Sequence, residues 1–446
     1  MPADVGVVNR RPVGEQVRPG GTRLLAVGAV VAAVAVIAYL VAIATHPMDA
    51  TLKGFDLQVY LGGAHQALHH ESGLYSWIYD GHPGIQFTYT PFAALVFAAG
   101  HAVSFKTLMA LVTIASIVAL FATIWIAFRE LGWQGQARLG ATLLVFGLVL
   151  WTEPVQRELF LGQVELVLMG LITWDVCQPD QRPWKGAITG ILAGIDLIPG
   201  IYILYLLVTR RFRQAAVAAG AFAVTVVIGF IGLPHASVTW WLHGDFFQAS
   251  RTGFVGSYQN QSLRGIMTRL IGSVNGAEAP WFVVAVIVLA AGLAAAVILD
   301  RRGHSFAALM AVALTGLLVS PISWDHHWVW IAPGLALIID TAVRAGRADG
   351  AGRPGLRAAW YALAAAVLIV FAAWPEFWKA KAGLLEGGLI NDVPAASFPH
   401  GDNPAYPEYH WHGLQLIAGN LELLAGLGLF VVLLIVVVRL RRPARA

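Results

Sequence analysis

LLAVGAVVAAVAVIAYLVAIAT, residues 24–45, is the stretch that decides the fold. A helix needs about 20 apolar residues to cross the hydrocarbon core of a bilayer. This run is too long for the apolar core of a signal peptide. It continues into His46-Pro47-Met48-Asp49, which offers no small-residue cleavage pattern. We therefore predict a membrane helix that the mature protein retains.

Similar apolar runs recur along the whole chain. Of its 446 residues, 58% are hydrophobic and 12% are charged, roughly half the charged fraction of a soluble domain. In lipid only helices or closed barrels satisfy the backbone, and these runs lack the alternation of barrel strands. An all-α polytopic membrane protein is expected, with helices at 24–45, 87–103, 107–128, 139–152, 163–177, 186–197, 198–209, 213–233, 280–299, 304–320, 327–343, 357–374 and 414–439.

Basic residues set the expected topology. The pI of 9.2 could suggest nucleic acid, but the arginines gather in short clusters between apolar runs, which marks those segments as cytoplasmic. Basic clusters at both termini require an even number of crossings, so about twelve transmembrane helices are expected. One short segment should fail to cross. The candidates are 87–103 and one half of the pair broken at Asp196 and Pro199, which suits a re-entrant hairpin.

The expected organisation is one membrane domain, 23–440, between two cytoplasmic tails. Residues 1–22 are expected to be disordered and residues 441–446 are basic. Cys177 is the only cysteine, so no intramolecular disulfide can form. With the N-terminus inside, the extracytoplasmic segments are 46–86, 153–162, 234–279, 321–326 and 375–413.

Asp56 stands just beyond the first helix, in Gly54-Phe55-Asp56-Leu57-Gln58-Val59-Tyr60. An acid there, followed by many aromatic residues, suits removal of a proton from a sugar hydroxyl, and the aromatic rings could stack on sugar faces. The alternative is that Asp56 caps a helix over Leu57 to Leu68, because aspartate is a preferred N-cap residue.

Two further segments carry polar side chains suited to a phosphate or a sugar. In Asn260-Gln261-Ser262-Leu263-Arg264-Gly265, the guanidinium of Arg264 could hold a phosphate. In Ser320-Pro321-Ile322-Ser323-Trp324-Asp325-His326-His327-Trp328-Val329-Trp330, a histidine could donate to phosphate or to a hydroxyl. Neighbouring histidines point about 100° apart on a helix, which disfavours a shared metal ion. The tryptophans could instead form an interfacial belt.

Ionisable residues also occur where membrane depth is expected. Glu165 opens an apolar helix and Asp196 interrupts another, so each is a candidate site residue. An ion pair of Arg157 with Glu165 or Asp196 is the structural alternative. His65 and His69, four residues apart, are read as exposed histidines of an amphipathic helix rather than as a metal pair.

Three motifs resemble glycosyltransferase family 87 of actinobacteria. They are Gly162-Gln163-Val164-Glu165, the Asn260–Gly265 segment, and Ser320-Pro321-x-Ser-Trp-x-His326-His327-Trp328. The similarity covers most of the chain. Trp174-Asp175-x-Cys177-Gln178-Pro179-Asp180 is similar to family members that build mycobacterial phosphatidylinositol mannosides.

The resemblance implies the GT-C architecture in the plasma membrane, with the active site on the extracytoplasmic side. It implies an inverting α-1,2-mannosyltransferase that moves mannose from a polyprenyl-phosphate-mannose donor to a phosphatidylinositol mannoside, a glycolipid acceptor. Neither a metal nor another cofactor is expected, and the chain lacks Asp-x-Asp.

The resemblance implies that an acid in the first extracytoplasmic loop acts as base, and Asp56 stands at that position. For the other residues the roles are our hypothesis. Asp56 and His326 are expected to be catalytic, and Arg264 and His327 to bind the donor phosphate. The residues expected to bind substrate are Tyr60, Gln163, Glu165, Asn260, Gln261 and Trp324. Where the family pattern has Lys-Leu-x-Pro, this chain has Asp196-Leu197-Ile198-Pro199, and an aspartate would repel phosphate. No phosphate role is therefore assigned to Asp196.

Two alternatives stay open at this point. One is another family activity, such as a lipomannan mannosyltransferase or an arabinofuranosyltransferase with a decaprenyl-phosphate donor. The other is a lipid or sugar transporter, because fold-level similarity alone does not establish chemistry. The absence of an internal repeat counts against transport.

Overall fold

The computed structural model describes residues 21–45, 54–79, 85–248, 251, 253–346, 354–373 and 407–441. Within these ranges the protein is helical, and its β-structure consists of two isolated bridges, Ile78 with Gln86 and Asn260 with Trp324. The all-α prediction is confirmed. Most of the two predicted tails and most of the predicted loop 375–413 lie outside the described residues.

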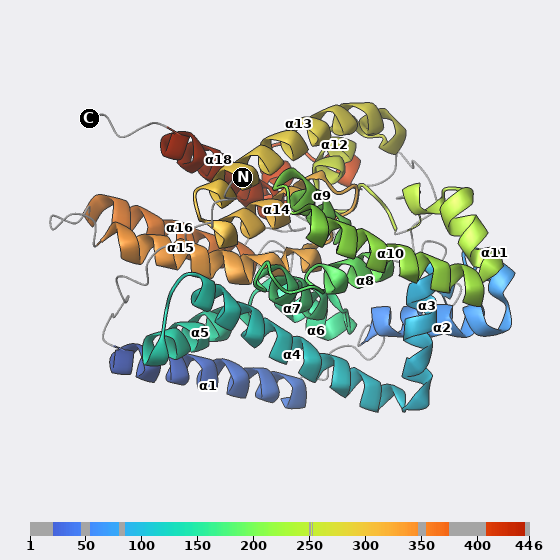
Figure 1. Ribbon diagram of the computed structural model, residues 1–446, viewed down its shortest axis with the longest axis horizontal. Helices are drawn as coiled ribbons and strands as arrows, with labels where there is room; N and C mark the ends of the chain where they lie inside the picture. The colour runs from blue at the N-terminus through green and yellow to red at the C-terminus, as the bar shows by residue number, and fades with distance from the viewer. Residues whose placement is uncertain are drawn as a thin grey trace, which may run out of the picture.

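Seven helical segments of the described chain are long and apolar enough to cross a membrane. Figure 1 shows them packed into one elongated bundle. One segment joins a 3₁₀ turn, Asp325–Trp330, to α15. The helices concerned are α1 (Gly21–Thr45), α4 (Phe105–Glu130), α10 (Phe212–Gly232), α13 (Val274–Arg301), α15 (Ile331–Ala345), α16 (Pro354–Ala373) and α18 (Leu421–Arg441).

The remaining apolar helices are shorter. An eighth span results if α5 (Gly135–Val149) and α6 (Glu153–Leu161), bent by 73° at their junction, cross as one unit. The expected number of about twelve crossings is therefore not found by length and composition. The difference arises because five helices have only 8 to 15 residues, namely α3 (Pro91–Ala98), α7 (Glu165–Val176), α8 (Ala187–Ile195), α9 (Gly200–Val208) and α14 (Ser305–Val319).

The predicted break at Asp196 and Pro199 is present. α8 and α9 have nine residues each, which gives each about 13 Å of helix. The Asp196 carboxylate accepts the backbone N–H of Ile198 at 2.9 Å, which closes the turn between the two helices. At the other end of α8, the carboxylate of Asp175 accepts the N–H groups of Gly186 and Thr189 at 3.0 and 2.9 Å. Side-chain acceptors thus satisfy backbone donors at the start of α8 and in the turn that follows it.

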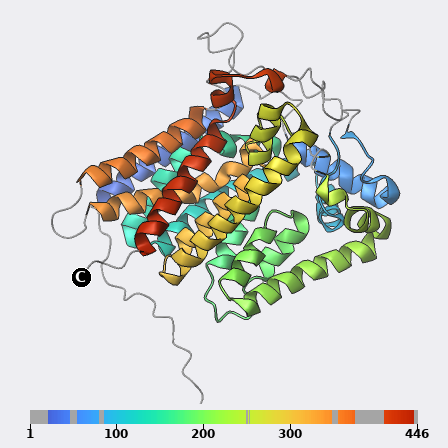
Figure 2. The ribbon, with the colours of Figure 1, turned by 90° about the horizontal axis from the view of Figure 1, so that it is seen from above.

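Close helix packing in the bundle depends on small residues. α1 lies along α5, and a Cβ added at Gly28 would lie 2.2 Å from the carbonyl oxygen of Gly140. A Cβ at Gly292 of α13 would meet Thr315 of α14 at 2.0 Å. Helices associate in lipid through such close backbone approach, since lipid tails are as apolar as leucine. Figure 2 shows α18 lying between α13 and α16, which closes the bundle around α14.

Three helices lie in segments that hydropathy alone treats as loops. They are α2 (Phe55–His69), α6 and α12 (Leu263–Ile271). Each is short or polar, and none is a candidate span by itself. They carry Asp56, Arg157 and Arg264, so the predicted loops provide rigid positions for the candidate side chains.

Candidate active site

Asp56 is the second residue of α2, and it does not cap this helix. The N-cap position is Gly54, whose φ of 68° lies in the left-handed region that favours glycine. The backbone N–H of Gly54 donates to the carbonyl of Phe160 at 2.8 Å, which ties the start of α2 to α6. The capping alternative for Asp56 is therefore wrong, and its carboxylate is directed to another partner.

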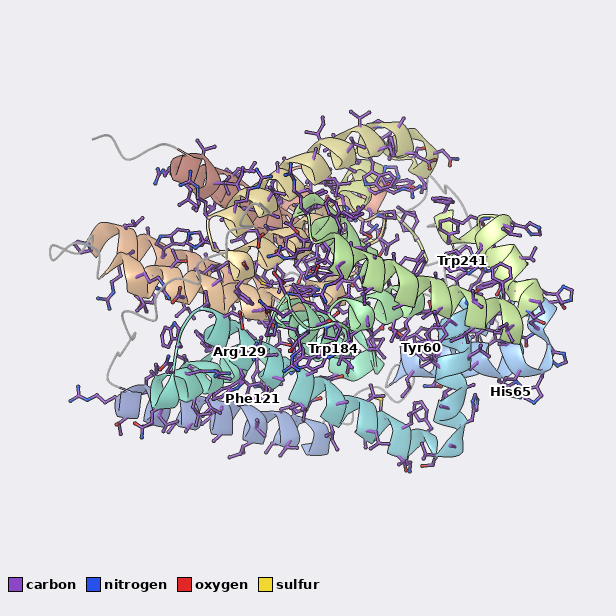
Figure 3. The ribbon with its side chains drawn as sticks, in the orientation of Figure 1. Tyr60, His65, Phe121, Arg129, Trp184 and Trp241 are labelled. Carbon is purple, nitrogen blue, oxygen red and sulfur yellow. The ribbon has the colours of Figure 1, made fainter. Side chains whose placement is uncertain are left out.

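That partner is Gln163, which stands two residues before the start of α7. The Gln163 Nε2 group donates to Asp56 Oδ2 at 2.7 Å. The hydroxyl of Tyr60 donates to Gln163 Oε1, and the hydroxyl of Tyr89 lies 2.8 Å from that of Tyr60. These contacts fix which end of the amide faces Asp56. Tyr60 and His65 both belong to α2 (Figure 3). The side chain of Tyr60 is buried, whereas that of His65 is exposed.

The side chains of Arg157 and His326 lie near the half-buried carboxyl of Asp56. Burial is the largest influence on Asp56 and raises the pKa of its carboxyl. The charges of His326 and Arg157 and the hydrogen bond from Gln163 act in the opposite direction, while Asp325 adds to the rise. The net effect is a pKa above the ordinary value of aspartate. A carboxylate with a raised pKa is a better proton acceptor.

His326 is held by the residue before it. Its Nδ1 lies 3.2 Å from Asp325 Oδ1, and its backbone N–H donates to the same oxygen at 2.8 Å. An ionised Asp325 favours the tautomer with hydrogen on Nδ1. The buried Nε2 atom has no hydrogen-bond partner among the described residues. The ring of His327 is nearly perpendicular, at 85°, to that of His326, with 4.7 Å between centroids.

Arg157 of α6 was not assigned to the site from the sequence. Its charge acts on Asp325 and Asp56, and its Nε atom is buried without a hydrogen-bond partner in the described chain. The expected alternative, an ion pair with Glu165 or Asp196, is not among the ion pairs of the described residues. The signal in the sequence was a polar run between two apolar helices.

Arg264, the predicted phosphate ligand, has different neighbours. Its guanidinium lies 3.8 Å from Glu278 Oε1 and sits over the ring of Trp281 at 5.0 Å. Both partners belong to α13. The guanidinium that the structure places with Asp56 is that of Arg157.

Asn260 and Gln261, predicted to contact substrate, hold the backbone of the His326 segment. The Asn260 side chain donates to the carbonyl of Val255 at 2.9 Å and accepts the N–H of Ser323 at 3.0 Å. Gln261 donates to Gly419 O at 2.8 Å and accepts the N–H of Leu423 at 3.1 Å. Both side chains are fully buried. We assign them a positioning role in place of the predicted substrate contact.

The same scaffold includes Trp324 and Arg269. Trp324 is half-buried, and its backbone pairs with Asn260. The guanidinium of Arg269 donates to Ser257 O at 2.5 Å, to Asn260 O at 3.0 Å and to Asn420 Oδ1 at 2.5 Å. Burial lowers the pKa of Arg269 to about 9. The Asn260–Gly265 motif is thus largely a structural joint between α12, the His326 segment and α18.

His65 and His69 were predicted to be exposed histidines of a helix, and the structure confirms this. His65 and His69 are exposed, with stacked rings 4.2 Å apart. In the part of the chain that the structure describes, no group of three His, Cys, Asp or Glu side chains could hold a metal ion. The groups assembled at Asp56 can instead accept a proton and hold an anion.

Comparison with known proteins identifies the family of the chain. The family model of glycosyltransferase family 87 matches residues 87–321, more than half of the chain. A relative from Mycobacterium tuberculosis, 34% identical over 68% of each chain, is named polyprenol-phosphate-mannose-dependent alpha-(1-2)-phosphatidylinositol pentamannoside mannosyltransferase. A protein of the same name from Mycolicibacterium smegmatis is 35% identical over 62% of this chain and 67% of its own.

A further M. tuberculosis relative is 33% identical over 57% of this chain and 62% of its own. It is named polyprenol-phosphate-mannose-dependent alpha-(1-2)-phosphatidylinositol mannoside mannosyltransferase. No solved structure matches the chain significantly. From the family match, the level of identity and the membrane-spanning helices, this chain is a multi-pass membrane glycosyltransferase that belongs to family 87, a GT-C family.

Proposed function

We propose that the protein is an inverting α-1,2-mannosyltransferase. Its donor is polyprenyl-phosphate-mannose and its acceptor is a phosphatidylinositol mannoside, as the names of its relatives suggest. The site faces the extracytoplasmic side, where the positive-inside rule puts Asp56. The observation that carries the proposal is the half-buried Asp56 carboxylate, held by Gln163 at 2.7 Å beside Arg157 and His326.

Asp56 acts as the general base. It accepts the proton from the 2-hydroxyl of the acceptor's terminal mannose, and the resulting oxygen nucleophile forms a bond to the anomeric carbon of the donor. The bond from that carbon to the phosphate oxygen breaks, and polyprenyl phosphate leaves with the electron pair. A single in-line displacement converts a β-linked donor into an α-linked product, so one carboxylate is sufficient.

Arg157 and His326 hold the donor phosphate. The guanidinium offers paired donors for phosphate oxygens, and His326 can donate from Nε2 when it is protonated. Both groups have a buried nitrogen without a hydrogen-bond partner among the described residues. Buried polar atoms are normally hydrogen-bonded, so a bound phosphate would satisfy them. His327 stays a second candidate donor from the same segment. The leaving group is already ionised before the reaction, so little acid assistance is needed.

The test is mannose transfer by the purified full-length protein in detergent. Wild type is incubated with radiolabelled polyprenyl-phosphate-mannose and phosphatidylinositol mannosides, and with decaprenyl-phosphate-arabinose in a parallel arm. We expect mannose transfer by wild type and none by Asp56→Asn. The control Glu130→Gln, an exposed residue paired with Arg129, keeps wild-type activity. Arabinose transfer, or lipid movement without a new linkage, would refute the proposed function.

A further inference from the structure

A pair of carboxyl groups, Glu165 and Asp196, lies on one flank of the site. Glu165 opens α7 and Asp196 stands in the break between α8 and α9, so two separate parts of the chain bring them together. The carboxyls are close enough for the charge of Asp196 to act on Glu165. Glu165 is 7% exposed, and its Oε1 atom has no hydrogen-bond partner among the described residues.

The pair connects to Asp56 through Gln163 and Tyr89. The Tyr89 hydroxyl lies 3.4 Å from Gln163 Oε1, and it interacts electrostatically with both Glu165 and Asp196. A third acid, Glu158, adjoins Glu165, and its Oε1 is also buried without a partner in the described chain. Tyr89 therefore joins the acid pair to the hydrogen-bond network that orients the base.

The cationic groups belong to the other flank. Arg157 interacts with Asp325, Glu153 and Asp56, and His326 with Asp325. Neither Glu165 nor Asp196 forms an ion pair with a cation of the described residues. Arg157 and His326 thus form a phosphate flank whose charges act on Asp56. Glu165 and Asp196 form an acidic flank, which Tyr89 links to Gln163.

The acidic flank selects the chemistry of its ligand. Adjacent carboxyls disfavour a second negative charge, so a phosphate is excluded there. A buried oxygen without a donor is costly, and the cost disappears when a ligand supplies an O–H group. Carboxylates and the Tyr89 hydroxyl together accept hydrogen bonds from neighbouring hydroxyls. A neutral sugar ring meets these requirements.

Which sugar binds follows from the direction of the displacement. In an in-line reaction the leaving phosphate and the attacking hydroxyl lie on opposite sides of the anomeric carbon. With the phosphate at Arg157 and His326, the acceptor enters from the other side of Asp56. We propose that Glu165, Asp196 and Tyr89 form a subsite that binds the hydroxyls of the acceptor's terminal sugar. This assignment rests on the function proposed above.

Steady-state kinetics of the full-length enzyme test the subsite. Glu165→Gln and Asp196→Asn each replace a carboxyl oxygen of the subsite by an amide nitrogen, which cannot accept a hydrogen bond from a sugar hydroxyl. We therefore expect the acceptor KM to rise roughly 10- to 100-fold. The donor KM should stay within about twofold, because the phosphate flank is unchanged. A rise in the donor KM instead, or an unchanged acceptor KM, overturns the proposal.

A binding measurement separates this proposal from the catalytic one. Asp56→Asn protein in detergent is titrated with phosphatidylinositol mannoside, with and without α-1,2-mannobiose as competitor. We expect saturable binding that mannobiose displaces, and at least a tenfold loss when Glu165→Gln is added. Unchanged affinity in the double variant overturns the subsite. Absence of transfer by wild type would refute the proposed function, whereas this titration reads the subsite without turnover.

Discussion

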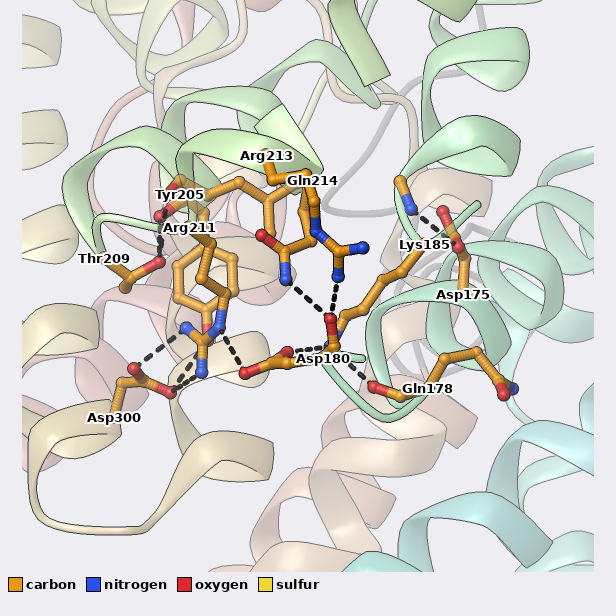
Figure 4. A network of polar contacts seen from close by, with 12 residues as sticks. Asp175, Gln178, Asp180, Lys185, Tyr205, Thr209, Arg211, Arg213, Gln214 and Asp300 are labelled. Carbon is orange, nitrogen blue, oxygen red and sulfur yellow. Dashed lines mark hydrogen bonds and ion pairs between the residues drawn. The ribbon is translucent and has the colours of Figure 1, made fainter. Parts of the chain in front are cut away.

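Two polar clusters lie at opposite ends of α7, and they differ in how well their side chains are satisfied. The Arg211 cluster consists of Asp180, Lys185, Arg211 and Asp300, and Figure 4 shows its contacts. Arg211 holds Asp300 through two hydrogen bonds of 2.9 and 3.0 Å, and Lys185 donates to Asp180 at 2.7 Å. The Asp56 cluster consists of Asp56, Arg157, Gln163, Asp325 and His326. Three of its members have buried atoms without partners among the described residues.

Asp180 and Asp56, one from each cluster, have pKa values that are shifted in opposite directions. Burial alone would raise the pKa of both carboxyls. At Asp180 the hydrogen bond and charge of Lys185, together with the charge of Arg211, hold the pKa below its ordinary value. At Asp56 burial dominates and the pKa is raised. A cluster whose side chains hydrogen-bond to one another stabilises the fold. A cluster that leaves buried donors and acceptors unpaired is suited to binding a ligand.

The largest expected effect is on kcat, and it follows from a change to Asp56, the central aspartate of the site. Asp56→Asn keeps the shape of the side chain but removes the proton acceptor. We expect kcat to fall by roughly 10²- to 10⁴-fold, the usual contribution of a general base. The melting temperature should stay close to that of wild type. Retention of more than a tenth of the activity would remove Asp56 from the mechanism.

Arg157 gives the next largest effect. Arg157→Met removes the guanidinium from the phosphate flank, and we expect the donor KM to rise roughly 10- to 100-fold. Arg157→Lys keeps the charge but loses the paired donors, so it should recover only part of the affinity. Titration with polyprenyl phosphate measures binding directly. Equal donor affinity in wild type and Arg157→Met would show that the phosphate binds elsewhere.

The Arg211 cluster should respond in stability rather than in chemistry. The Arg211 and Asp300 side chains are 20% and 11% exposed, so Arg211→Met should lower the free energy of unfolding by about 1–3 kcal/mol. Specific activity below the melting temperature should be unchanged. Arg129→Met, which removes an exposed pair with Glu130, is the matched control and should change stability by less than about 0.5 kcal/mol. Loss of transfer in folded Arg211→Met would abolish the distinction between the clusters.

The pH dependence of transfer gives the smallest effect. Only the ionised Asp56 accepts a proton, so kcat/KM for the acceptor falls as pH decreases through the pKa of this carboxyl, about tenfold per pH unit. Because burial raises that pKa, the midpoint should lie above about 3.9, the ordinary value for aspartate. A rate that is constant down to that pH would contradict the raised pKa.

Hydropathy located the apolar helices, and each of the thirteen predicted segments overlaps a helix, but α2, α6 and α12 lie in segments that it treats as loops. Hydropathy could not count the crossings, since α8 and α9 have only nine residues each and are separated by the break from Asp196 to Pro199. Their role depends on packing, which a hydropathy profile does not contain.

The site was predictable where single side chains have distinctive chemistry. Asp56, Gln163, Tyr60 and His326 were all expected, and the structure brings them together. Arg157 was missed because its closeness to Asp56 depends on how α6 packs against the His326 segment. Asn260 and Gln261 were assigned to substrate because an amide side chain looks the same in sequence whether it binds a sugar or a backbone.

The most direct test of the central claim is an experimental structure of the full chain with polyprenyl-phosphate-mannose bound to Asp56→Asn. The unpaired nitrogens of the Asp56 cluster should be hydrogen-bonded to the donor phosphate. Its oxygens should lie within about 3 Å of the guanidinium of Arg157 and of His326 Nε2. The anomeric carbon should face residue 56. A phosphate bound at Arg264, with Arg157 and His326 still unpaired, would contradict the account.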